Sequence, residues 1–215
     1  MAIRIREFAD RTRAAEALAG ALQAGLGGAL AARGHARLVV SGGSTPAPMF
    51  RLLRGKPLAW NRIDVLASDE RDVPADHPDR NEAMIRRELL QGAAVPARLI
   101  PLIPPGPIPD RFDEVVLGMG EDGHTASLFP DSPDLAAALV SRDPLARLWV
   151  PRLDMHRVSL TPAALLASER ISLLFFGAEK RAVFEAALRG DDPAKYPVRA
   201  VLVQDAVPVT VYTAP

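Results

Sequence analysis

The sequence contains no cysteine, carries no net charge and is poor in aromatic residues. Without cysteine, the chain forms no disulfide, no iron–sulfur cluster and no thiolate zinc site. Its 26 basic and 26 acidic residues cancel, so no long-range field attracts nucleic acid or an anionic membrane. Aromatic residues make up 5% of the chain, which argues against a platform that stacks nucleic-acid bases. Any anionic ligand must therefore be held by a local site.

Long apolar runs are missing as well. No stretch approaches the ~18 consecutive apolar residues that span a bilayer. The first ten residues, "MAIRIREFAD", are charged and lack the apolar core of a signal peptide. We therefore expect a soluble, cytoplasmic protein with no membrane partner. Hydrophobic residues nevertheless make up 48% of the chain, enough for one substantial globular domain over residues 1–215.

Short apolar runs alternate with longer amphipathic stretches along the chain. Runs typical of strands lie at residues 3–8, 36–40, 62–68, 98–103, 112–118, 147–153, 156–160, 170–177 and 200–213, the last of which we expect to form edge strands. Helical stretches lie at residues 11–33, 47–55, 81–92, 161–168 and 178–190. This alternation predicts an α/β fold with a largely parallel, Rossmann-like sheet and helices on both faces.

Polar clusters follow three of these strands, at the point where each strand ends. They are "SGGSTP" at residues 41–46, "ASDERDVP" at residues 67–74 and "GMGEDGHTAS" at residues 118–127. In parallel sheets, ligands bind in the crevice beyond the carboxyl ends of the strands. The three clusters are therefore expected to meet at one edge of the sheet.

The first cluster has the composition of an anion-binding loop. Gly42 and Gly43 allow positive φ and a close backbone approach, so that successive amides can point at one anion. Ser44 and Thr45 add hydroxyl donors. A plain tight turn, with Ser44 or Thr45 as the N-cap of the next helix, explains the same residues. The loop matches neither the Walker motif nor the six-residue dinucleotide fingerprint.

The other two clusters supply ionisable side chains. Asp69 and Arg71 lie nearest the end of their strand and hence nearest the crevice, whereas the other acids of this stretch are typical of a solvated loop. His124 has the carboxylate of Asp122 two residues before it, an arrangement that suits proton transfer near neutral pH. Metal binding is not predicted, because Asp122 and His124 alone make a poor metal site.

Two further cations flank predicted strands. Arg157 in "HRVSLTP" and Lys180 in "FFGAEKRAV" are long enough to reach over the sheet edge to a phosphate. By position alone, Lys180 is also explained as a surface lysine in the first turn of a helix.

Together, these stretches resemble the 6-phosphogluconolactonases of the oxidative pentose phosphate pathway. The family's run from Gly-Met-Gly to Leu-Phe-Pro stands complete at residues 118–130, and the stretches at 41–46, 69–74, 157–161 and 177–180 occur in the family's order. The resemblance implies a three-layer αβα sandwich, shared with glucosamine-6-phosphate deaminase and ribose-5-phosphate isomerase. It also implies hydrolysis of 6-phospho-D-glucono-1,5-lactone to 6-phosphogluconate without a metal or other cofactor.

The resemblance also implies roles for individual residues. His124 is the general base, and we expect Asp122 or a backbone carbonyl to orient it. Asp69 and Arg71 line the site, with Arg71 as the expected stabiliser of the oxyanion, a role that backbone amides near Gly123 could also fill. The phosphate is expected on a loop and two cations, namely Gly42, Gly43, Ser44, Thr45, Arg157 and Lys180.

Two stretches depart from the family pattern. Arg80 stands where family members usually have serine, and the segment "PPGPIPDRF", beginning at residue 104, replaces a helix. Its prolines prevent a helix around residues 104–111. One face of the sheet is therefore expected to be less covered.

Two other functions stay open. An isomerase or deaminase of amino-sugar phosphates shares the fold, the loop and Asp-Gly-His, but those deaminases continue with Ile-Ala and later Asn-Glu-Pro, where this chain has "TASLFP" at residues 125–130. A non-catalytic sugar-phosphate sensor needs a DNA-reading helix pair and a basic face, which this neutral chain does not suggest. We expect a small phosphorylated sugar lactone as the partner, and a monomer or weak homodimer.

Overall fold

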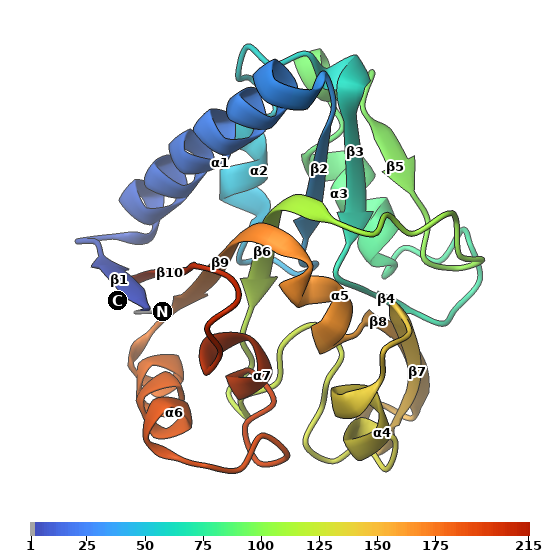
Figure 1. Ribbon diagram of the computed structural model, residues 1–215, viewed down its shortest axis with the longest axis vertical. Coiled ribbons are helices and arrows are strands. Elements are labelled where there is room, and N and C mark those ends of the chain that lie inside the picture. Colours follow the sequence, from blue (N-terminus) through green and yellow to red (C-terminus); the bar gives the residue numbers. More distant parts are fainter. Residues whose placement is uncertain (1–2) are drawn as a thin grey trace.

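The structure, a computed structural model, describes residues 3–215 (Figure 1). Within these residues the main sheet has seven strands: β1 (Arg4–Glu7), β2 (Ala36–Val40), β3 (Ile63–Ala67), β5 (Arg98–Ile100), β6 (Phe112–Gly118), β9 (Ser168–Phe176) and β10 (Val209–Ala214). They lie in the order β1-β10-β9-β6-β2-β3-β5, and every neighbouring pair is parallel. The predicted parallel sheet is thus confirmed.

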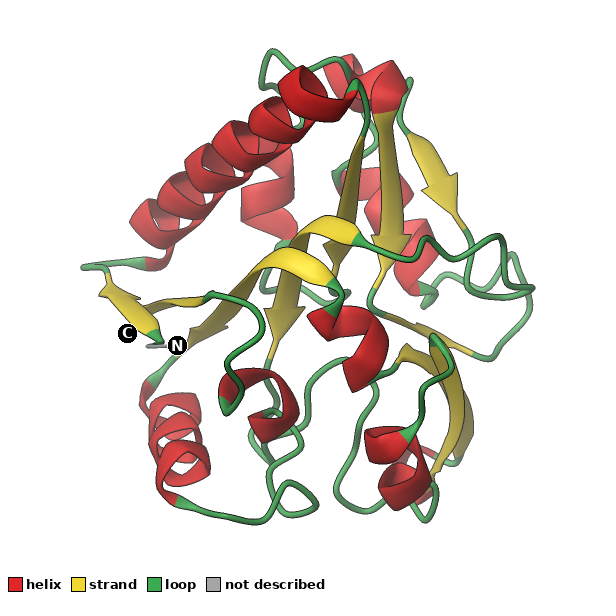
Figure 2. Ribbon diagram, viewed as in Figure 1, coloured by secondary structure: helices red, strands yellow, loops and turns green. Residues whose placement is uncertain are grey.

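Helices cover both faces of this sheet and complete the three layers (Figure 2). One face carries α1 (Arg11–Arg33), α2 (Ala47–Leu53) and α3 (Asn81–Glu88), and the other carries α5 (Pro162–Leu166), α6 (Ala178–Arg189) and α7 (Arg199–Leu202). Short 3-10 segments are η1 (Trp60–Arg62), η2 (Gly92–Ala94) and η3 (Pro151–Leu153). No helix among residues 3–215 combines the length and the apolar character needed to cross a bilayer.

The central strands are apolar because both of their faces are buried. In β2, Leu38 and Val40 contribute to the core beneath α1 and α2, whereas Val39 contributes to the core beneath α5, α6 and α7. Successive side chains of a strand point to opposite faces, so a sheet covered on both sides needs an unbroken apolar run. The run "LVV" at residues 38–40 meets that need.

α1 shows how a glycine in a helix serves packing. Asp10 caps the helix by accepting a hydrogen bond from the Arg13 amide at 2.8 Å, and Gly34 ends it in the left-handed conformation. Gly25 lies inside the helix, where glycine costs about 1 kcal/mol relative to alanine. A Cβ at Gly25 would lie 1.5 Å from Oε1 of Glu114 on β6. The glycine therefore makes room for a buried carboxyl group.

A second, antiparallel sheet lies beside the main one. It consists of β4 (Asp69–Arg71), β7 (Leu145–Val150) and β8 (Met155–Leu160), in the order β4-β8-β7. The sequence prediction is wrong here, since it gives residues 69–71 as loop and no second sheet. It also omits α4 (Leu135–Val140), which packs on β7 through Leu135, Ala138 and Leu148.

The prediction of C-terminal edge strands over residues 200–213 is confirmed as strand only from residue 209 on, and it is wrong about the first part of the stretch and about the edge position. Residues 199–202 form α7, and β10 lies inside the sheet between β1 and β9. The valines of this stretch favour a strand by propensity. Burial of Val198, Val201 and Leu202 in the core beneath α7 outweighs that preference.

The connector at residues 104–111 contains no helix, as its prolines predict. Its Ile108 packs against both cores, so the connector still covers part of the sheet edge next to β5. Just before it, the carbonyl of Ile103 accepts a hydrogen bond from Nη2 of the buried Arg80 at 3.0 Å. The two departures from the family pattern thus lie against each other.

Candidate active site

The three polar clusters meet in one cleft, as predicted. β6, β2 and β3 are neighbours in the sheet, and the loops at their carboxyl ends surround a cavity of about 760 Å³. The start of α6 and the end of η3 complete its wall. All site residues predicted from the sequence line this cavity, namely Gly42, Gly43, Ser44, Thr45, Asp69, Arg71, Asp122, His124, Arg157 and Lys180.

The loop after β2 lines the cleft with residues whose backbone amides have no partner among the described residues. Gly43 has φ +90°, which favours glycine, and a Cβ on Gly42 would lie 2.0 Å from Oδ1 of Asn81. Within residues 3–215, no amide of residues 42–45 donates a hydrogen bond to the protein. The N-cap of α2 is Pro46, and no side chain caps this helix. The alternative of Ser44 or Thr45 as a helix cap is therefore wrong, and these amides are free for an anion.

The loop after β6 holds His124 by main-chain contacts. The Gly120 amide donates to the carbonyl of His124 at 3.0 Å, and the Val198 amide donates to the carbonyl of Gly123 at 2.9 Å. Gly123 has φ +79°, and a Cβ there would lie 2.8 Å from the ring of Tyr196. Glycine is thus required before the histidine both by conformation and by close packing.

Asp122 is the residue that orients His124. Its Oδ1 lies 2.5 Å from Nδ1 of the imidazole and also accepts the His124 amide at 3.1 Å. An ionised carboxylate only accepts hydrogen bonds, so Nδ1 carries a proton in this contact, and in the neutral imidazole Nε2 is then the acceptor. Burial disfavours the charge of Asp122, but hydrogen bonds from His124 and Arg152 outweigh it and hold the pKa of this carboxyl below its ordinary value.

Arg152 is a site residue that sequence reasoning missed. It lies in η3, pairs with Oδ2 of Asp122 and lines the cleft. Its guanidinium lies over the ring of Phe129 at 4.7 Å, and that ring lies 4.1 Å from the imidazole of His124, between centroids. The sequence carries no signal for this contact, because residues 147–153 resemble a plain strand.

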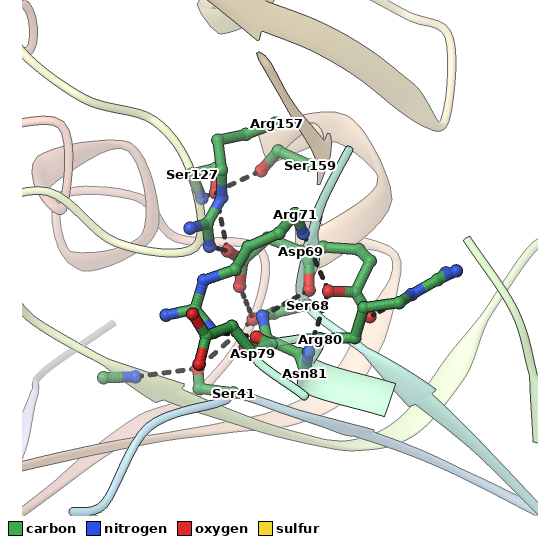
Figure 3. A network of polar contacts seen from close by, with 12 residues as sticks. Ser41, Ser68, Asp69, Arg71, Asp79, Arg80, Asn81, Ser127, Arg157 and Ser159 are labelled. Atoms are coloured by element: carbon green, nitrogen blue, oxygen red, sulfur yellow. Dashed lines mark hydrogen bonds and ion pairs between the residues drawn. The ribbon is translucent and has the colours of Figure 1, made fainter. Parts of the chain in front are cut away.

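A buried polar network lies on the other side of the cleft (Figure 3). Arg157 pairs with Oδ2 of Asp69 and donates through Nε to Oγ of Ser127 at 2.9 Å. Ser127 in turn donates to Oδ2 of Asp69 at 2.5 Å, and Ser68 donates to Oδ1 at 2.8 Å. Burial opposes the charge of Asp69, but Arg157 and the serines outweigh it and lower the pKa of this carboxyl. The network joins β4, the His124 loop and β8.

Arg71 and Lys180 are the two remaining cations of the cleft. Arg71 donates through its guanidinium to the carbonyl of Asp79, and its amide donates to Oε1 of Glu70 at 2.7 Å. The carboxylate of Glu70 also accepts the amide of Asn81 at 2.8 Å, which ties α3 to β4. The side chain of Lys180 makes no hydrogen bond or ion pair with any described residue. Its ammonium is therefore available to a ligand.

Comparison with known proteins identifies the family. A family model described as glucosamine-6-phosphate isomerases/6-phosphogluconolactonase matches residues 9–110 and 103–210. The chain belongs to this family. A 6-phosphogluconolactonase from Pseudomonas putida is 37% identical over 230 residues, covering 100% of this chain and 94% of that relative. One from Pseudomonas aeruginosa is 40% identical over 222 residues, covering 94% and 90%.

Solved structures of the family have the same architecture. A crystal structure of a 6-phosphogluconolactonase from Shewanella baltica matches with a TM-score of 0.96 at 35% identity, covering 100% of this chain and 98% of that one. A monomeric glucosamine-6-phosphate deaminase matches with a TM-score of 0.76 at 19% identity, over 97% of each chain. The deaminase therefore shares the fold, as the resemblance implies.

Proposed function

We propose that this chain is an enzyme that hydrolyses 6-phospho-D-glucono-1,5-lactone to 6-phosphogluconate, the lactonase step of the oxidative pentose phosphate pathway. One observation carries the proposal. Free backbone amides, an unpaired lysine and a histidine oriented by a carboxylate line the same cavity of about 760 Å³. Relatives named 6-phosphogluconolactonase that are 36–40% identical over nearly the whole chain support the proposal.

The phosphate is bound first in this proposal. The amides of residues 42–45 and the ammonium of Lys180 surround it, and Arg157, which is paired with Asp69, adds a guanidinium donor from the cleft wall. Two or three charge-assisted hydrogen bonds supply several kcal/mol of binding, roughly 1.5–3 kcal/mol each. Binding at this remote group fixes the ring over the sheet edge and presents its ester carbonyl to His124.

Hydrolysis then needs one base and one stabilised oxyanion. Nε2 of His124 takes a proton from water as the water oxygen bonds to the carbonyl carbon. Arg71 stabilises the negative charge that develops on the carbonyl oxygen. The ring C–O bond breaks as the tetrahedral intermediate collapses, and His124 returns its proton to the leaving ring oxygen. Asp69 holds the adjoining wall in place through Arg157 and Ser127.

The alternatives are less well supported. The deaminase similarity rests on fold, and this chain lacks the Asn-Glu-Pro stretch that follows the histidine in those enzymes. The sensor alternative does not use the Asp122–His124 pair. We also propose a monomer or weak homodimer, since every residue of the proposed site lies on one chain. We propose a cytoplasmic location because a chain without cysteine fits a reducing compartment.

The test is a direct assay with freshly prepared lactone. Purified protein should release acid faster than the spontaneous reaction, and His124→Ala should lower kcat by roughly 10²–10⁴-fold. His35→Gln is the matched control, because His35 lies before β2, at the opposite end of the sheet, where it pairs with Asp64. Ammonia release from glucosamine-6-phosphate, or tight binding without turnover of either compound, would contradict the proposal.

A further inference from the structure

Arg152 reaches the cleft from the small sheet and not from the main one. It lies in η3, directly after β7, and its side chain is 41% exposed. Its Nη2 pairs with Oδ2 of Asp122, and its Nε lies 3.7 Å from Oδ1 of Asp131. Two carboxylates thus hold the guanidinium, which leaves it less free than Lys180 to bind a substrate phosphate.

Asp122 is held at both of its oxygens. Oδ1 faces Nδ1 and the amide of His124, whereas Oδ2 faces Arg152. A carboxylate that is bound only at one oxygen can rotate about its last torsion. The contact with Arg152 removes that freedom and keeps Oδ1 directed at the imidazole.

The ring of Phe129 closes the arrangement. It packs against the imidazole of His124 and also lies beneath the guanidinium of Arg152. Phe129 itself is buried, so it cannot move aside freely. Asp122, His124, Phe129 and Arg152 therefore form a closed set of four contacts.

We propose that Arg152 is a positioning residue that fixes Asp122 and Phe129 and thereby sets the orientation and the tautomer of the His124 imidazole. The proposal rests on the proposed function, in which Nε2 of His124 is the base. A base gains its effect from alignment with the attacking water, and small misplacements cost large factors in rate. Arg152 acts before any substrate is present.

Steady-state kinetics separate positioning from substrate binding. Arg152→Gln should lower kcat about 10- to 100-fold and leave KM within about threefold of the unchanged protein. Arg147→Gln is the matched control, since Arg147 lies on the adjoining strand and pairs with Asp72 outside the cleft. In an Asp122→Asn background, Arg152→Gln should lower kcat further by less than about threefold. A rise in KM at constant kcat, or full additivity with Asp122→Asn, would overturn the proposal.

A second measurement reads the tautomer without turnover. Nitrogen-15 NMR of the imidazoles distinguishes a proton on Nδ1 from one on Nε2, and His124→Ala identifies the signal among the four histidines. The neutral imidazole of His124 should show the Nδ1–H form in the unchanged protein, and Arg152→Gln should show a mixture of tautomers. The same tautomer in both proteins would overturn the proposal even if the enzyme is active. If the unchanged protein has no lactonase activity but Arg152→Gln still changes the tautomer, the proposed function is refuted and the positioning role of Arg152 is not.

Discussion

Asp69 and Arg157 form an ion pair beneath the cleft, although 88 residues separate them along the chain. Their side chains are 6% and 8% exposed, and Ser127 bonds to both. A buried charge that loses its partner is costly, whereas the pair as a whole contributes little net stability. The ion pair therefore matters for the shape of the site more than for the total stability of the fold.

Removal of either Asp69 or Arg157 alone should destabilise the protein more than removal of both. Asp69→Asn should destabilise the protein by roughly 3–5 kcal/mol, because Arg157 then keeps an uncompensated buried charge. Arg157→Met should have a similar effect by stranding Asp69. The double variant should lose less unfolding free energy than the two single variants lose together. Urea unfolding of all four proteins measures these losses. Strictly additive losses would mean that the two side chains do not interact in solution.

Lys180 should act on binding and not on the chemical step. Lys180→Met removes an ammonium that has no partner in the described part of the chain, so the fold should be unaffected. Loss of one charge-assisted bond of roughly 1.5–3 kcal/mol should raise KM for the lactone about 10- to 100-fold, with kcat nearly constant. Lys56→Met, outside the cleft, is the control. An unchanged KM would remove Lys180 from the phosphate site.

Glycines of α1 should respond to alanine in opposite directions. A Cβ at Gly25 meets the buried Glu114 carboxyl, so Gly25→Ala should destabilise the protein by about 1–3 kcal/mol. At Gly20 nothing lies within 4 Å of the added Cβ, so Gly20→Ala should stabilise by up to about 1 kcal/mol. Urea unfolding at neutral pH measures both. Equal effects at the two positions would show that helix propensity alone determines the change in stability.

Glu114 should make stability fall as the pH rises. Burial raises the pKa of its carboxyl from 4.5 to about 7, against the opposing effect of Arg170. The folded state therefore holds a proton that the unfolded state releases, and stability declines between about pH 4.5 and pH 7.

Glu114→Gln removes this titration and is the variant to measure. Relative to the unchanged protein, its free energy of unfolding should rise by roughly 2–3 kcal/mol between pH 5 and pH 8. Glu16→Gln, an exposed charge change on α1, controls for altered net charge. A difference that stays constant or falls over this range would contradict the raised pKa.

Much of the site could be predicted because its parts follow strands with a clear pattern. The apolar runs of β2, β3 and β6 identify parallel strands, and parallel strands bring their carboxyl ends to one edge. The clusters that follow these strands, which contain Gly43, Asp69 and His124, are therefore predicted to lie in one cleft. The prolines of residues 104–111 likewise exclude a helix by local chemistry alone.

The remainder depends on contacts between distant segments. Strand propensity in β7 and β8 does not reveal that they pair with β4 and not with the main sheet. Arg152 escapes sequence reasoning for the same reason, because its partner Asp122 lies 30 residues away on another element. In α7, burial of Val201 and Leu202, together with the N-cap Val198, reverses the strand preference of the valines.

The small sheet has only a modest core of its own. Beneath α4 it buries Leu128, Leu135, Ala138 and Leu148, far fewer side chains than either face of the main sheet buries. Yet this unit carries Arg152 and Arg157 to the cleft. A transient detachment of this corner would separate Arg152 from Asp122, which lies on the loop after β6, while the seven parallel strands stay intact. Such partial opening costs less than global unfolding. Catalysis should therefore disappear at a lower urea concentration than the far-ultraviolet signal of the helices, so the enzyme would lose its activity before it loses its fold.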